Sequence, residues 1–253
     1  MIRGAPRSIS VRVWQMTGKR SIRQPPECPF THYVDPVTIR QSGKAYLAGE
    51  YVLLFFGLAS VYAVLFRGTS PIPFLLVLGL AVVAYLLRSS GFDRASLWRR
   101  ETFRSQARSI AVLWCLAAVC LSVTVALLRP NLLFALPREN PLIWALVMVL
   151  YPLLSVYPQE LIFRGFVFQR YAPVFGEGTR MVAASAVAFG FVHIAFGSWL
   201  SVAMTIVGGW IFATRYRRTQ SLFTVSVEHA LYGMLVFTVG LGQYFYHGAA
   251  VGT

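Results

Sequence analysis

The sequence predicts an all-α protein, a polytopic membrane helix bundle of about seven transmembrane helices. Of its 253 residues 57% are hydrophobic and only 13% are charged, which is less charge than a soluble domain of this length carries. Several runs of about 20 residues have almost no charge and are long enough to cross a bilayer. Basic residues gather between these runs, as membrane topology requires.

The net charge of +14 does not indicate a nucleic-acid partner. Nucleic-acid-binding domains concentrate their basic residues on one face, whereas here they separate apolar runs. The three cysteines, Cys28, Cys115 and Cys120, have no CxxC spacing and predict no redox or metal motif. A signal peptide has a short basic region before its apolar stretch, whereas the first apolar run here follows a long basic segment. We therefore expect this run to remain in the protein as a membrane span.

The chain divides into a basic N-terminal tail, 1–44, and a membrane domain, 45–253. The tail holds Glu27 and Asp35 against many more Lys and Arg residues, and four prolines break any long helix in it. We therefore expect a mostly irregular cytoplasmic segment with short surface-helix pieces. Its charge would favour contact with anionic lipid.

The apolar runs of the membrane domain are separated by short polar segments. Between the second and third runs, 88–108 interleaves arginines with aromatic residues, which fits a helix lying on the membrane surface or a solvated loop. If one of the long runs breaks into two spans, there are eight spans in all instead of seven. The expected spans are 46–66, 71–87, 110–128, 141–170, 181–197, 200–214 and 221–245.

The distribution of basic residues predicts the orientation. If the N-terminus is cytoplasmic, the outer segments carry only Arg67, Arg129 and Arg138, and the inner segments carry nearly all the others. The positive-inside rule then places the C-terminus outside. We expect a multi-pass integral membrane protein, of the bacterial inner membrane, whose partners include the lipid bilayer.

The stretch Tyr157–Gly165 carries an acid and a base inside an apolar run. Glu160 and Arg164 are four residues apart, so they share a helix face and can pair. An ionisable side chain costs roughly 2.5–3.5 kcal/mol at a bilayer centre and marks a functional site by default. Counted from the inner ends of their spans, Glu160, His193 and His229 lie at one depth, roughly 12–20 Å from the surface.

Each of these groups also has a purely structural interpretation. The Glu160–Arg164 pair can serve folding alone, and a single histidine in an apolar helix is often a packing residue. Convergence of three such groups favours a site, and three chemistries fit it. Glu and His could activate water for peptide hydrolysis, the three could be ligands of a catalytic zinc although no HExxH is present, or they could relay protons in a transporter.

The order of these residues resembles a known family. Glu160-xxx-Arg164-Gly165, then Phe189-xxx-His193, then His229 is similar to the pattern of the CPBP intramembrane proteases, which include the type II CAAX prenyl endopeptidases and bacterial Abi proteins. The resemblance covers about 141–240. It implies an all-helical membrane fold and endoproteolysis near the C-terminus of a membrane-embedded or membrane-associated protein substrate, with a glutamate-activated water and without an obligatory metal.

The family pattern EExxxR, FxxxH and HxxxN is changed at two positions. Gln159 stands where the first glutamate is expected, and Gly233 stands where the asparagine is expected. The resemblance implies catalytic roles for Glu160, Arg164, His193 and His229. We also expect substrate contacts for Gln159, Phe189 and Tyr232, and Tyr232 is a candidate for the missing hydrogen-bond donor.

We therefore expect an intramembrane endopeptidase in which His193 and Glu160 position or activate the water. Arg164 would orient Glu160, and His229 would stabilise the developing oxyanion. The alternative is a catalytically inactive relative that acts as a partner-binding, immunity or assembly factor, because an amide at Gln159 cannot act as a base.

Overall fold

The computed structural model describes residues 36–66 and 68–245. Over these residues the chain is helical and contains no strand, which confirms the predicted all-α fold. Helix α1 begins at Pro36, inside the segment that we expected to be an irregular tail. The rest of that tail, 1–35, lies outside the described residues.

The helical elements follow one another with short connections. The α-helices are α1 (Pro36–Val52), α2 (Leu58–Leu65), α3 (Ile72–Arg88), α4 (Glu101–Leu128), α5 (Ala135–Glu139), α6 (Pro141–Tyr151), α7 (Tyr157–Glu160), α8 (Val167–Arg170), α9 (Ala172–Phe175), α10 (Thr179–Val192), α11 (Trp199–Thr219) and α12 (Leu222–Thr238). The π-helical turns are η1 (Leu53–Gly57), η4 (Pro152–Val156) and η5 (Leu161–Phe166). The 3-10 turns are η2 (Arg94–Leu97), η3 (Pro130–Leu132), η6 (His193–Phe196) and η7 (Gly242–Tyr244).

Four stretches of the described residues are long and apolar enough to cross a membrane. Two further apolar helices, α3 and α12, are shorter. These helices confirm an integral membrane bundle, while the number of spans stays a prediction. The four stretches are Gly43–Leu65, Glu101–Leu128, Pro141–Arg170 and Thr179–Phe196.

The helix from Pro141 to Arg170 is continuous, as the sequence predicted, and we call it the site rod. Two π-helical turns, η4 and η5, interrupt its α-helical geometry on either side of α7. Pro152 begins the first of these turns, where a missing N–H and a bulky ring disfavour ordinary α-helix. π-helical turns are often found at functional sites because they redirect the side chains that follow them.

Two predicted boundaries are wrong. Within 88–108 the structure has only the short 3-10 turn η2, and 101–108 form the first turns of α4, so the helix of the third span begins before residue 110. The sixth span does not end at 214, because α11 continues to Thr219. Arg215, which lies just beyond the predicted end of that span, is only 6% exposed inside the bundle. The ion pair with Glu228 on α12 compensates the cost of burying the guanidinium.

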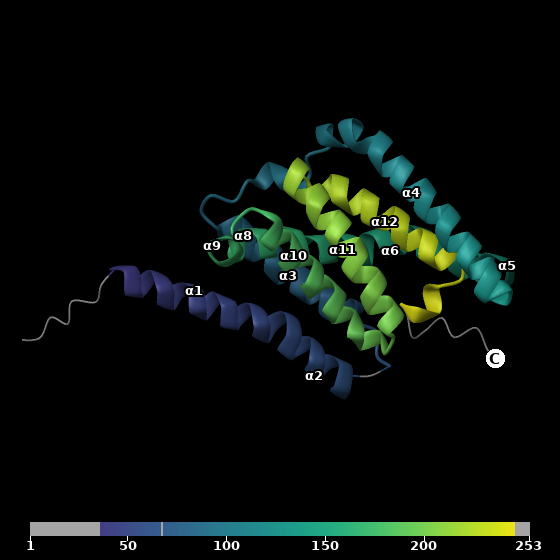
Figure 1. The fold of residues 1–253 in the computed structure, drawn as a ribbon, viewed down its shortest axis with the longest axis horizontal. Helices are drawn as coiled ribbons and strands as arrows, with labels where there is room; N and C mark the ends of the chain where they lie inside the picture. Colours follow the sequence, from purple (N-terminus) through teal and green to yellow (C-terminus); the bar gives the residue numbers. More distant parts are fainter. Residues whose placement is uncertain (1–35, 67, 246–253) are drawn as a thin grey trace, which may run out of the picture.

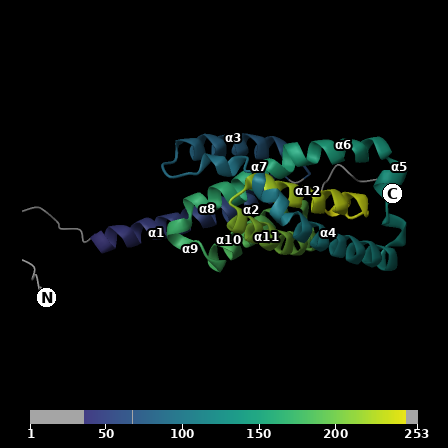
Figure 2. The ribbon, with the colours of Figure 1, turned by 90° about the horizontal axis from the view of Figure 1, so that it is seen from above.

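Helices α10, α11 and α12 lie in the middle of the bundle, with α1–α2 along one side and α4 along the other (Figure 1). Turning the molecule shows α3 and α6 along the edge opposite α4 (Figure 2). Helices α10 and α11 approach closely at two glycines. A Cβ at Gly190 would lie 2.2 Å from Ile206 Cγ1, and one at Gly209 would lie 3.0 Å from Ala186 Cα. Small residues allow this close approach.

Candidate active site

Glu160 and Arg164 form the expected ion pair in the interior of the bundle. Both side chains are 0% exposed, and Arg164 Nη1 lies 3.1 Å from Glu160 Oε1. Arg164 Nη2 also donates a hydrogen bond of 3.2 Å to the Gly209 carbonyl on α11. The guanidinium lies 4.6 Å from the centroid of the Phe189 ring, an arrangement that favours the cation. The pair therefore links the site rod to α10 and α11.

His229 on α12 is the second partner of Glu160. Its Nδ1 lies 2.7 Å from Glu160 Oε1, and because a carboxylate only accepts, Nδ1 carries the hydrogen. The imidazole stacks on Phe212, with centroids 4.6 Å apart and planes 20° from parallel. It meets Phe189 edge-on, with centroids 5.3 Å apart. These contacts fix both the orientation and the tautomer of the ring.

His193 lies at the end of α10 and is held by its own helix. Its Nδ1 donates a 2.7 Å hydrogen bond to the carbonyl of Phe189, one turn earlier. The Phe189 ring lies 4.8 Å from the His193 ring, so the two histidines flank the same phenylalanine. Since a carbonyl can only accept, Nδ1 carries the hydrogen and Nε2 of the neutral ring carries the lone pair.

A cavity of about 470 Å³ opens between α4, the site rod, α10, α11 and α12. This is within the size range of ligand sites, and its wall is mostly apolar. Neither Glu160 nor Arg164 lines it, because His229 lies between Glu160 and the cavity. The polar and aromatic residues of the wall include Tyr151, Ser155, Gln159, Phe189, His193, His229 and Tyr232.

The structure thus brings the two histidines and the three predicted substrate-contact residues to one cavity. Gln159 Nε2 donates a 2.7 Å hydrogen bond to Ser155 Oγ. Its Oε1 has no hydrogen-bond partner among the described residues. Phe189 contributes a nearly buried ring, 1% exposed, and Tyr232 lines the wall from α12. The assignment of catalytic roles to individual residues stays a prediction.

Tyr151 is the site residue that sequence reasoning missed. It lies on the cavity wall with its hydroxyl 3.2 Å from His229 Nε2. The available signal was spacing, because Tyr151, Ser155 and Gln159 follow one another at intervals of four along an otherwise apolar run. Residues four apart lie on one helix face.

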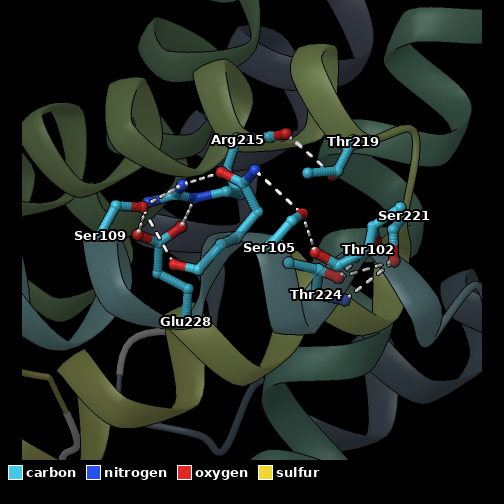
Figure 3. Close-up of polar contacts among 9 residues, drawn as sticks. Thr102, Ser105, Ser109, Arg215, Thr219, Ser221, Thr224 and Glu228 are labelled. Atoms are coloured by element: carbon cyan, nitrogen blue, oxygen red, sulfur yellow. Dashed lines mark hydrogen bonds and ion pairs between the residues drawn. The ribbon is translucent and has the colours of Figure 1, made fainter.

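Glu228 is next to His229 in the sequence, but its carboxylate belongs to a different cluster. Arg215 Nε and Nη2 both donate to its carboxylate at 2.8 Å, and Arg215 Nη1 donates to Ser109 Oγ on α4. Figure 3 shows Arg215 between Glu228 and Ser109, with Thr102, Thr224 and Ser221 forming a second polar group nearby. Glu228 does not line the cavity. This cluster clamps α4 to α11 and α12.

The three candidate zinc ligands do not form a three-ligand site. No group of three or more His, Cys, Asp or Glu side chains in 36–66 and 68–245 is placed so that it could hold a metal ion. His229 turns one ring nitrogen to Glu160 and the other to Tyr151, and Glu160 is bound by Arg164. His193 turns its Nδ1 to a backbone carbonyl.

Residues 140–235 match the family model described as "Type II CAAX prenyl endopeptidase Rce1-like". This part of the chain is Rce1-like. The predicted resemblance to the CPBP intramembrane proteases is confirmed, over nearly the same residues that the motifs indicated. The Rce1-like segment contains the site rod, α10, α11 and most of α12, and so every residue of the Glu160–Arg164–His229 cluster. Comparison with curated proteins finds no match, and comparison with solved structures finds none either.

Proposed function

We propose that this protein is an intramembrane endopeptidase that cleaves a membrane-embedded or membrane-associated protein near its C-terminus. One observation carries the proposal: two oriented imidazoles share the wall of an apolar cavity inside an Rce1-like segment. The mostly apolar wall suits a peptide that arrives from the bilayer. The positive-inside pattern supports a cytoplasmic N-terminus and an external C-terminus.

In this proposal His193 is the general base. Its Nδ1–H is held by the Phe189 carbonyl, so Nε2 accepts a proton from a water molecule in the cavity. The water oxygen bonds to the scissile carbonyl carbon, and the carbonyl oxygen takes the π electrons and becomes an oxyanion. Return of the proton from His193 to the amide nitrogen allows the C–N bond to break. The products are a new carboxyl terminus and a free amine.

Glu160 acts through His229 in this proposal and is a positioning residue. It holds His229 Nδ1 at 2.7 Å, with Arg164 fixing the carboxylate from the other side. Second-sphere carboxylates of this kind set the tautomer and orientation of a catalytic imidazole. His229, held in this way, lies on the wall of the same cavity as the base.

One observation favours a second, non-catalytic function. Gln159 places an amide, which cannot serve as a base, on the cavity wall where the family pattern has glutamate. A cavity with this wall could hold a membrane segment of a partner protein without cleaving it. The two functions differ in one respect: only the protease cleaves a peptide bond of the bound protein, and that cleavage requires His193.

The test is mass spectrometry of membrane-protein C-termini from cells that carry the wild type, His193→Ala, Glu160→Gln or the control Cys115→Ala. Cys115 is exposed on α4 and does not line the cavity, so its replacement controls for handling of a mutant membrane protein. All four proteins must accumulate equally. We expect a shortened C-terminus with the wild type and Cys115→Ala that is absent with His193→Ala. Identical C-termini in all four strains would reject the protease and favour partner binding.

A further inference from the structure

Tyr151 occupies a specific place beside His229 that neither the motif residues nor the family match explains. It is the last residue of α6, just before the π-helical turn that Pro152 begins. Its hydroxyl lies 3.2 Å from His229 Nε2, and its ring packs edge-on against Phe237, with centroids 5.4 Å apart. The side chain is therefore anchored by packing on one side and by His229 on the other.

The Tyr151 ring lies directly against the backbone of Gly233. A Cβ built at Gly233 would be 2.2 Å from the Tyr151 Oη and 2.3–2.4 Å from two of its ring carbons. No side chain at position 233 is compatible with this placement of Tyr151. Gly233 lies four residues after His229, on the same face of α12. The phenol thus fills the space into which a side chain at position 233 would point.

The hydrogens of this group can be assigned from the partners. Glu160 accepts from His229 Nδ1, so a neutral His229 has its lone pair on Nε2 and Tyr151 donates to it. If His229 is instead an imidazolium, Nε2–H donates to Tyr151 Oη and the phenolic hydrogen is free. In the imidazolium arrangement the free phenolic hydrogen can be donated to an incoming oxyanion, and in the neutral arrangement the same hydrogen must first leave His229 Nε2. Neutral His229 by itself has none to offer.

We propose that Tyr151 is a catalytic residue that donates the hydrogen bond stabilising the oxyanion on the scissile carbonyl, from the space beside Gly233. This inference rests on the proposed protease function. An oxyanion is a much stronger acceptor than an imidazole nitrogen or an uncharged carbonyl, so the phenolic hydrogen bond strengthens as the transition state forms. Tyr151 keeps its proton throughout, and no bond to it forms or breaks. His229, held by Glu160, orients the phenol.

The test compares Tyr151→Phe with Tyr62→Phe. The first change removes the hydroxyl and keeps the ring against Gly233 and Phe237, so the fold should be retained. The second removes a hydroxyl from α2, where Tyr62 donates to the Thr69 carbonyl and does not line the cavity. The substrate is a quenched fluorescent peptide spanning the bond whose cleavage depends on His193, supplied to purified protein in detergent micelles. We expect kcat of Tyr151→Phe to fall by about 10²–10³-fold with little change in KM, and Tyr62→Phe to stay close to the wild type.

Gly233→Ala provides an independent variant, because its methyl group cannot coexist with the present position of the phenol. We expect it to lower kcat at least as far as Tyr151→Phe. Wild-type kcat in Tyr151→Phe, or an equal loss in Tyr62→Phe, would overturn the role of Tyr151 while leaving the protease intact. If the wild type and His193→Ala are equally inactive, the protease function fails and this inference fails with it.

Discussion

Replacing Arg164 by methionine tests whether the buried cluster behaves as a charge pair in a low-dielectric interior. Methionine retains much of the side-chain volume but removes the ion pair with Glu160 and the hydrogen bond to the Gly209 carbonyl. Glu160 is then left as a fully buried carboxylate with His229 as its remaining partner. Removing one member of a buried ion pair leaves an uncompensated charge, which is far more costly than losing the attraction itself.

The expected loss is about 3–5 kcal/mol of the free energy of unfolding, since both side chains are 0% exposed. The same rod carries a matched control in Arg170, which binds Glu50 with a hydrogen bond of 2.7 Å but is 31% exposed. Arg170→Met should cost only about 0.2–1 kcal/mol, because water solvates the released carboxylate. Both variants exchange an arginine for a methionine in one helix and differ in burial.

Adding Glu160→Met to Arg164→Met should recover part of the loss. The double variant has no unpaired buried charge. It leaves His229 Nδ1 without its acceptor, which costs about 1–3 kcal/mol, and it still lacks the Arg164 hydrogen bond to the Gly209 carbonyl. The assay is equilibrium unfolding of the purified proteins by titration with SDS in mixed micelles, followed by tryptophan fluorescence. Equal losses for Arg164→Met and Arg170→Met, or a double variant as unstable as the sum of the single ones, would refute the reasoning.

Two more predictions concern the cavity and the helix packing. Gln159→Glu adds a carboxylate to the cavity wall beside Ser155 Oγ. A well-placed general base contributes about 10²–10⁴-fold to the rate, so we expect a clear rise in kcat for the fluorescent peptide. An unchanged or lower kcat would show that His193 does not need a carboxylate at this position. Gly190→Ala drives a methyl group to within 2.2 Å of Ile206 and should destabilise the protein by about 1–3 kcal/mol in the SDS titration. Its control, Gly49→Ala, meets nothing within 4 Å and should be nearly neutral, and similar losses for both would contradict the close α10–α11 contact.

The sequence predicted much of the site because membrane helices have regular geometry. Four-residue spacing was enough to pair Glu160 with Arg164, and rise per residue predicted that His229 could reach Glu160, with which it forms a hydrogen bond. The boundaries failed where charge was taken as a sign of the membrane surface. Arg215 lies just beyond the predicted end of the sixth span, and Glu228 on a neighbouring helix keeps it inside the bundle. No local pattern reveals that partner.

By itself, the sequence determined that the chain is an all-helical membrane protein with a buried Glu–Arg–His–His set, since hydropathy and helical period depend only on neighbouring residues. Only the tertiary structure decided which groups face the cavity. Glu160 lies behind His229, Gln159 lies on the wall, and Tyr151 takes the space left by Gly233. These facts depend on how α6 and α12 pack together, and residues about 80 positions apart make no local signal of their contact. For that reason no sequence motif reveals that the Tyr151 phenol on α6 fills the space beside Gly233 on α12.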